Sequence, residues 1–346
     1  ATIFIPDSFE PSQYTFLSIY FVLASFVFQG FYNALEMTKI HMKVVLISNI
    51  INIYLNAGFI YGSDNIVTLL SYYNLNNLSF LWIAFDFPEL GVKGAGLATL
   101  ISSFMMVVLY MLFLLNDEMK NKYQVFKLGI KYELLKKQAK LAFPLATQEL
   151  FSSIGFFMFF KILDLIGTME LATTNVIFRI AHASFMPVVG LGQATSTLTG
   201  KYIGEKRIDK LNDLIFQTIY LSLFIMGTMG TLFILFPEYI ISLFNVPDEI
   251  YLLGIPTLQL IGILQFFDAI GISLWFVVTA AGDVKFSAIT DALLIWLVFV
   301  PSAYLLGIVF NLGYWGPWIG FSLHIILFAI IISFRIFSGK WKGIEV

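Results

Sequence analysis

The chain has 346 residues, of which 59% are hydrophobic and 12% are charged, against roughly 45–50% and about 25% in an ordinary soluble domain. A water-soluble fold cannot bury so much apolar surface, and the excess runs along most of the chain, so lipid is the expected solvent. The net charge of -2 excludes the basic patch that nucleic-acid binding needs, and the absence of cysteine excludes disulfides and thiolate chemistry.

Nine stretches are long and apolar enough to cross a bilayer, which takes about 20 helical residues. They predict an all-α, polytopic integral membrane protein with spans near residues 13–35, 44–61, 94–115, 141–166, 171–200, 214–236, 250–281, 286–310 and 314–334. A tenth stretch, 66–85, is interrupted by several polar residues, among them Asn74 and Asn77, and carries Trp82. Because tryptophan favours the membrane surface, we expect an external or interfacial segment there.

The positions of Lys and Arg predict the orientation. With nine spans, seventeen of the twenty basic residues fall on one side, while Lys93 lies on the other and Lys161 and Arg179 lie within spans. Since cytoplasmic loops retain Lys and Arg, we expect a multi-pass protein of the plasma (inner) membrane with a cytoplasmic carboxy-terminus. The amino-terminus would then lie outside without a signal sequence, so we expect about three further helices before it.

A basic stretch separates two predicted lobes of a helical bundle. Residues 1–115 form a partial amino-terminal lobe, 116–140 a basic cytoplasmic linker and 141–346 a carboxy-terminal lobe. The last predicted span of each lobe opens with the pattern Leu-Gly-x-x-Gly, at 90–94 and 312–316. Repeated halves are common in transporters, and this pattern favours a duplication.

Several strings resemble the multidrug and toxic compound extrusion (MATE) family of the MOP flippase superfamily. They are NIYLNAGFIYG at 52–62, LGVKGAGLAT at 90–99, GLGQA at 190–194, TGKYIGE at 199–205, and Asp268 followed by AAGD at 280–283. The resemblance covers nearly the whole chain in the family's order. It implies twelve helices in two lobes, of which this chain would hold helices four to twelve.

Two carboxylates are candidates for ion coupling. Asp268 lies mid-span with no basic residue within a helical turn, where a charge costs at least about 2.5–3.5 kcal/mol. Desolvation favours its protonated form, so it is suited to exchange a proton. Its position also matches a family carboxylate associated with ion coupling. The alternative is a carboxyl group that only bonds a neighbouring helix.

Glu149 is the second carboxylate candidate and follows Pro144, whose ring bends the helix. One subgroup of the family has a glutamate eight residues after this proline, a position held here by Ser152. Glu149 lies three residues earlier, on nearly the same face, and is a candidate replacement with Gln148 beside it. The departure at Ser152 puts the coupling ion, H⁺ or Na⁺, in question.

The remaining polar residues of the spans have a structural and a functional interpretation. Lys161 and Asp164 are spaced to neutralise each other, and Arg179 needs an acid from another helix. His182 and His324 are expected as interhelical hydrogen-bond donors, and Asp291 near the cytoplasmic surface. The cavity-lining candidates are Ser152, Gln148, Arg179, Asn52, Asn56 and Gln265.

These features predict an antiporter, not an enzyme. We expect a central cavity, open alternately to each side, that exports organic cations, drugs or other amphipathic solutes in exchange for H⁺ or Na⁺. No cofactor, catalytic residue, metal site, nucleic-acid partner or obligate protein partner is expected, and the partners are the bilayer and a small organic solute. A lipid-linked saccharide flippase of the same superfamily is the alternative, and a membrane-embedded enzyme a remote one.

Overall fold

The computed structural model describes residues 9–116 and 131–343, together with Met119, Lys120, Tyr123 and Gly129. No strand occurs among these residues. The chain divides into two compact units, residues 1–129 and 130–346, and each is described by itself. Much of the predicted linker 116–140 lies outside the described residues.

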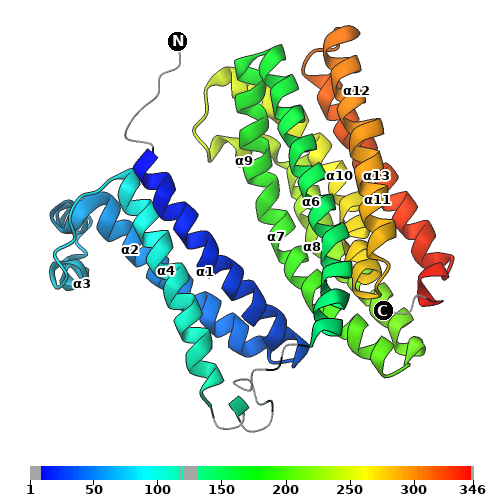
Figure 1. Ribbon diagram of the computed structural model, residues 1–346. Helices are drawn as coiled ribbons and strands as arrows, with labels where there is room; N and C mark the ends of the chain where they lie inside the picture. The colour runs from blue at the N-terminus through cyan, green and yellow to red at the C-terminus, as the bar shows by residue number, and fades with distance from the viewer. Residues whose placement is uncertain (1–8, 117–118, 121–122, 124–128, 130, 344–346) are drawn as a thin grey trace. The chain divides into compact units, whose positions relative to one another are not determined.

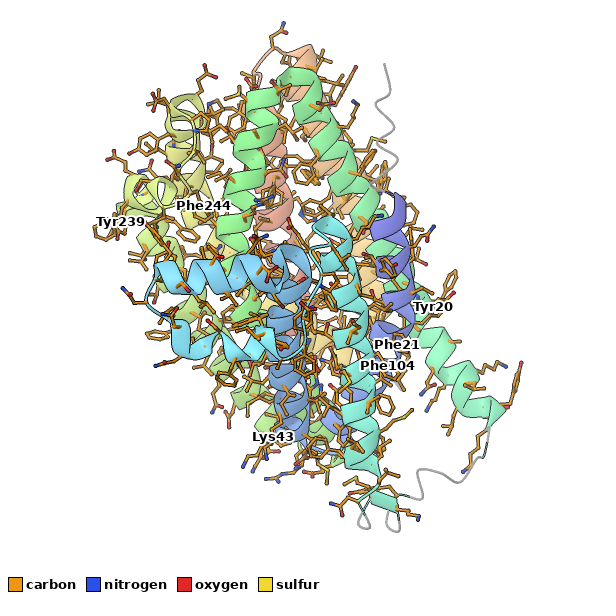
Figure 2. The ribbon with its side chains drawn as sticks, turned by 90° about the vertical axis from the view of Figure 1, so that its left-hand side faces the viewer. Tyr20, Phe21, Lys43, Phe104, Tyr239 and Phe244 are labelled. Carbon is orange, nitrogen blue, oxygen red and sulfur yellow. The ribbon has the colours of Figure 1, made fainter. Side chains whose placement is uncertain are left out.

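The first unit is built from three long helices (Figure 1). Helix α4 (Val92–Leu114) packs against both α1 (Phe9–Ala34) and α2 (Thr38–Tyr72). At one end, Tyr32 and Tyr110 are fully buried and their rings stack. Further along, the rings of Phe21 and Phe104 meet edge to face at 5.3 Å (Figure 2). Aromatic contacts of this kind join α1 to α4 along their length.

Helix α2 bends sharply at Gly62, so the tenth apolar stretch does not continue it as a span. Gly62 has φ 75° and ψ 158°, a backbone conformation that favours glycine. The rest of α2, the short turn η2 (Asn76–Leu78) and α3 (Phe80–Ile83) lie crosswise to the long helices in Figure 2. Ser63 Oγ donates to the carbonyl of Trp82 at 2.8 Å and fastens this segment. The interfacial position of this segment stays a prediction.

The second unit is a bundle of long helices lying side by side (Figure 1). Helix α10 (Asp248–Ala280) is central and packs against α7 (Thr168–Gly204), α8 (Ile208–Leu235) and α13 (Trp315–Phe337). Helix α6 (Tyr132–Ile166) packs against α7 and α11 (Val284–Leu294). The chain from α11 continues through η3 (Ile295–Phe299), α12 (Val300–Tyr304) and η4 (Leu305–Val309), and α9 (Pro237–Ser242) and η5 (Lys340–Gly343) are short.

Proline accounts for the irregular course of the chain between α11 and α13. Both η3 and η4 have π-helical turns, and Pro301 lies between them in α12. A proline inside a helix removes one backbone donor and its ring presses on the preceding turn. Wider π turns on either side accommodate that distortion.

All nine predicted spans coincide with helices. Among the described residues, eight helical segments are long and apolar enough to cross a membrane. The ninth, α6, has 35 residues but carries Glu149, Lys161 and Asp164 on its apolar stretch. The chain is an all-α, multi-pass membrane protein, and its helices run past the predicted ends by several residues.

The two Leu-Gly-x-x-Gly strings build the same local structure. Gly91 and Gly313 have φ 54° and 56°. The amide of Leu90 donates to the carbonyl of Phe59, and the amide of Leu312 to that of Leu306, at 2.8 and 3.0 Å.

The second glycine of each string lies against backbone. An added Cβ on Gly94 would be 2.2 Å from the Phe59 carbonyl oxygen, and one on Gly316 would be 2.1 Å from the amide nitrogen of Gly307. Each string therefore turns the chain and lets two helices approach without side chains between them.

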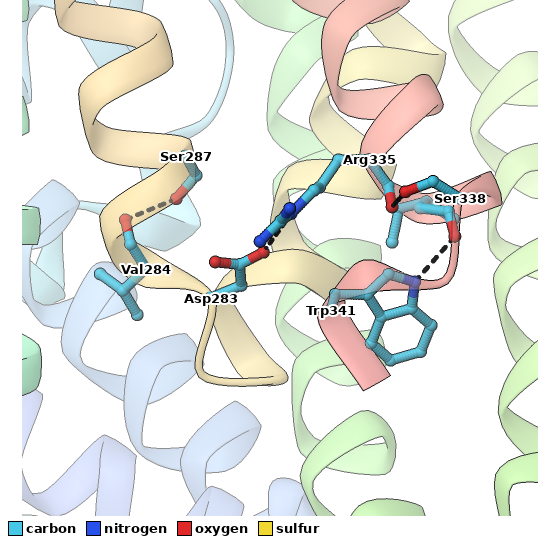
Figure 3. Close-up of polar contacts among 7 residues, drawn as sticks. Asp283, Val284, Ser287, Arg335, Ser338 and Trp341 are labelled. Atoms are coloured by element: carbon cyan, nitrogen blue, oxygen red, sulfur yellow. Dashed lines mark hydrogen bonds and ion pairs between the residues drawn. The ribbon is translucent and has the colours of Figure 1, made fainter. Parts of the chain in front are cut away.

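A buried ion pair closes one end of the second unit. Arg335 Nε donates to Asp283 Oδ2 at 2.7 Å, as Figure 3 shows. The Arg335 guanidinium also lies 4.5 Å from the ring centroid of Phe286. Beside it, the indole of Trp341 donates to the Ile336 carbonyl at 2.8 Å. These contacts tie the end of α13 to the turn between α10 and α11.

Candidate functional site

The second unit contains a partly open cavity of about 730 Å³. Helices α6, α7, α10, α11 and α13 all contribute side chains to its lining. Aromatic rings form much of the wall, namely Phe156, Phe178, Phe185, Trp275, Phe276, Phe321 and Phe328. A mostly apolar, concave surface with a few polar groups is typical of sites for small organic ligands.

Asp268 lies in the lining of this cavity, on the central helix α10. It is partly buried. Among the described residues, no hydrogen bond or ion pair engages its carboxyl group. His324 acts on this carboxyl group only through its charge. A carboxyl group on an apolar wall without a hydrogen bond is available to a proton, a metal cation or a cationic ligand.

Asp291 is the most heavily engaged carboxylate of the cavity. Its Oδ2 accepts hydrogen bonds from Gln148 Nε2 at 3.0 Å and from Ser152 Oγ at 2.9 Å. Its Oδ1 is 3.1 Å from His324 Nε2. These partners come from α6 and α13, so Asp291 on α11 joins three helices through one carboxylate.

Asp291 was predicted near the cytoplasmic surface of the membrane, and that depth stays a prediction. Asp291 is 9% exposed and lines the cavity. The criterion that selected Asp268, a carboxylate inside an apolar span, applies equally to Asp291 and could have found it.

Neighbouring residues on α6 have different surroundings. Gln148 is buried and points to Asp291, whereas Glu149 is exposed and still contributes to the lining. Successive helical residues do not share a face. Gln148 therefore points into the bundle, and Glu149 points to the open side of the cavity. It is Asp291, and not Glu149, that contacts Ser152.

Polar atoms in the wall remain unpaired. Gln148 and Gln265 are 8% and 5% exposed. Their Oε1 atoms, with Trp275 Nε1 and His324 Nδ1, are buried without a hydrogen-bond partner among the described residues. The other end of Gln265 is held, because its Nε2 donates to Ser184 Oγ at 2.7 Å. The cavity therefore presents both acceptors and donors.

Arg179 does not line the cavity. Its neighbours Phe178 and His182 on α7 do, but Arg179 is exposed and no ion pair among the described residues includes it. The predicted acid partner from another helix is not found among the described residues of this unit. Depth along a span places a residue in the membrane but does not say which helix face carries it.

Asn52 and Asn56 belong to the first unit. Asn52 Nδ2 donates to Ser102 Oγ at 2.9 Å, which joins α2 to α4. Asn56 Nδ2 donates to Asn52 Oδ1 at 2.8 Å. The structure gives them a hydrogen-bond network that joins α2 to α4 within the first unit.

The remaining predictions concern the pair Lys161–Asp164 and the histidines of the spans. Lys161 Nζ lies 2.7 Å from Asp164 Oδ2 on α6, as their spacing predicts. His324 joins α13 to α11 through Asp291, whereas His182 lines the cavity and stacks on Phe185. No metal-binding cluster of His, Cys, Asp or Glu occurs within the described part of the chain.

Comparison with known proteins agrees with the MATE resemblance. The MatE family model matches residues 144–305. The probable multidrug resistance protein NorM of Thermotoga maritima is 29% identical over 310 residues, 88% of this chain and 61% of that protein. The corresponding protein of Mannheimia succiniciproducens is 24% identical over 320 residues, 90% of this chain and 64% of that protein. The chain thus spans less than two thirds of the length of these relatives.

Solved structures share the fold. An outward-facing multidrug resistance MATE family transporter of the MOP superfamily matches with a TM-score of 0.81 at 21% identity, covering 97% of this chain and 70% of that one. A MATE structure in the bent conformation matches at 0.78 and 21%, covering 96% and 69%. The family-model match over residues 144–305, the sequence relatives and these structures together support the resemblance to the multidrug and toxic compound extrusion (MATE) family of transporters.

Proposed function

We propose that the protein is part of an ion-coupled antiporter that exports organic cations, drugs or other amphipathic solutes. Asp268 carries the proposal. It lines a cavity of about 730 Å³ beside several aromatic rings, and no hydrogen bond or ion pair with a described residue engages its carboxyl group. An aromatic wall attracts cations by about 0.5–2 kcal/mol per well-placed ring, and a nearby carboxylate adds a direct charge partner.

Exclusive binding at this carboxylate couples the two fluxes. A protonated or Na⁺-bound Asp268 cannot pair with a cationic solute, so the ion entering and the solute leaving bind in turn. Coupling requires that each ligand bind the two access states with different affinity. The pump needs no covalent chemistry and no cofactor. Glu149, on the open side of the cavity, is the second ion-coupling candidate.

The orientation and the division into lobes belong to the same proposal. We place the carboxy-terminus in the cytoplasm, in keeping with the excess of Lys and Arg on its side. Residues 1–115 and 141–346 contribute to two lobes, and 116–140 links them. The relatives' names, which describe multidrug resistance, support drugs as the solutes.

A flippase for a lipid-linked saccharide is less well supported. Recognition of a diphosphate relies on Arg and Lys donors, and neither residue occurs among the described side chains that line the cavity. Three carboxylates line it instead, Glu149, Asp268 and Asp291. This charge pattern favours a cationic solute.

Transport into everted membrane vesicles tests the proposal. Wild-type vesicles should accumulate a fluorescent organic cation when a proton or Na⁺ gradient is imposed, and a lipid-linked saccharide analogue should not move. D268N should abolish gradient-driven accumulation with normal expression. D164N is the matched control, since Asp164 pairs with Lys161 outside the cavity, and should transport normally. Wild-type transport by D268N would exclude Asp268 from the mechanism.

A further inference from the structure

We propose that His324 and Asp291 form a proton-binding site in the cavity, at which the proton is taken up by His324 Nδ1, and that Asp268 lies close enough for its charge to act on the same imidazole. The inference deepens the proposed ion coupling and rests on it for its role in transport. The binding of the proton itself is a property of the pair and can be measured without transport.

The first step is that Asp291 is built to stay ionised. Gln148 and Ser152 both donate to Oδ2, and His324 Nε2 lies against Oδ1. Hydrogen bonds to the ionised form stabilise that form, and a protonated Asp291 would have to give one of them up. An incoming proton therefore does not settle on this carboxylate.

The second step is the tautomer of His324. Because Nε2 faces a carboxylate oxygen at 3.1 Å, the neutral ring carries its hydrogen on Nε2 and leaves the lone pair on Nδ1. Nδ1 is buried and has no hydrogen-bond partner among the described residues. The ring therefore presents a free basic nitrogen, with Asp291 positioned to stabilise the imidazolium that forms.

The surrounding rings favour that imidazolium further. The centroids of Phe299 and Phe328 lie 5.7 and 6.2 Å from that of His324, and the Phe328 ring is close to parallel with it. Aromatic faces stabilise a cation at this range. Unlike a free proton, Na⁺ would need several oxygen ligands, and both oxygens of Asp291 already accept hydrogen bonds.

Protonation changes the charge that the cavity offers a cationic solute. The pair is net negative with neutral His324 and net neutral with imidazolium. The other titratable groups in the lining are Glu149 from α6, His182 from α7 and Asp268 from α10. A proton on His324 therefore weakens the attraction of this wall for a cation, so the pair adds a second point at which proton and solute compete.

Histidine nitrogen NMR on isotopically labelled protein in lipid nanodiscs tests the inference. The chain has three histidines, so H41Q and H182Q assign the third resonance without removing it. We expect neutral His324 as the Nε2-protonated tautomer, with the imidazolium form appearing on acidification. In D291N, proton affinity should fall about tenfold or more, because the negative partner is lost.

The variants separate this inference from the proposed function. D268N should lose ion-driven transport while its His324 still takes up a proton. A His324 that stays neutral on acidification for as long as the protein remains folded, carries its neutral hydrogen on Nδ1, or binds its proton as well in D291N as in wild type would overturn the inference. So would displacement of the resonance by Na⁺ at fixed pH. If D291N does not fold, the tautomer and titration of the wild-type ring still decide the matter.

Discussion

Gly316→Ala should destabilise the second unit, and the structure gives the size of the effect. The new Cβ would lie 2.1 Å from the amide nitrogen and 2.3 Å from the Cα of Gly307, more than 1 Å inside normal contact distance. Both are backbone atoms, so no side-chain rotation relieves the clash. The helices must separate, which typically costs about 1–3 kcal/mol or more in a packed interior.

Thermal unfolding followed by intrinsic tryptophan fluorescence measures this cost. For a unit of this size, about 2–4 °C is lost per kcal/mol, so G316A should melt about 2–12 °C lower than wild type. Gly200→Ala is the matched control, because its Cβ would have nothing within 4 Å and alanine favours a helix. A G316A protein as stable as wild type, or a G200A protein equally destabilised, would refute the close helix contact.

Three further variants examine other parts of the structure. Arg335→Ala leaves the carboxylate of Asp283, whose side chain is 6% exposed, without its charge partner. The free energy of unfolding should fall by about 3 kcal/mol, measured by thermal unfolding, and adding D283N to this variant should restore part of it. Gln148→Leu removes one donor to Asp291 and should cost about 1–3 kcal/mol, whereas Thr147→Val on the exposed side should be nearly neutral in the same assay. Trp275→Leu should weaken equilibrium binding of an organic cation about 2–5-fold through loss of about 0.5–1 kcal/mol; Trp275→Phe should retain most of it, and equal loss in both would exclude a role for the ring.

The long helices could be predicted because bilayer thickness sets their length and apolar composition. The turn glycines Gly91 and Gly313 could be found because the string that contains them is repeated. Both have a positive φ, which explains why glycine occupies this position in each string. Helix ends were less predictable, since α2 and α7 run well beyond the apolar stretch. Helix α7 gains polar residues at both ends, whereas α2 continues past the bend at Gly62 into the tenth apolar stretch.

The site was only partly predictable, because spans indicate depth and not helix face. Asp268 could be predicted because a carboxylate within a membrane span is costly and is usually kept for a function. The structure places it in the lining of the cavity. Arg179 satisfied the same criterion but faces away. The hydrogen bonds of Asp291 join it to His324, more than 30 residues away on α13, and to Gln148, more than 130 residues away on α6. No local sequence pattern predicts contacts between residues so far apart.

Ion release on solute binding tests the central role of Asp268 most directly. Purified protein in weakly buffered nanodiscs is mixed with a saturating organic cation, and released protons or Na⁺ are measured. Wild type should release the ion in proportion to bound solute, since both compete for one carboxylate, and D164N should do the same. D268N should release none or much less. Undiminished release by D268N at equal solute binding would contradict exchange at this carboxylate.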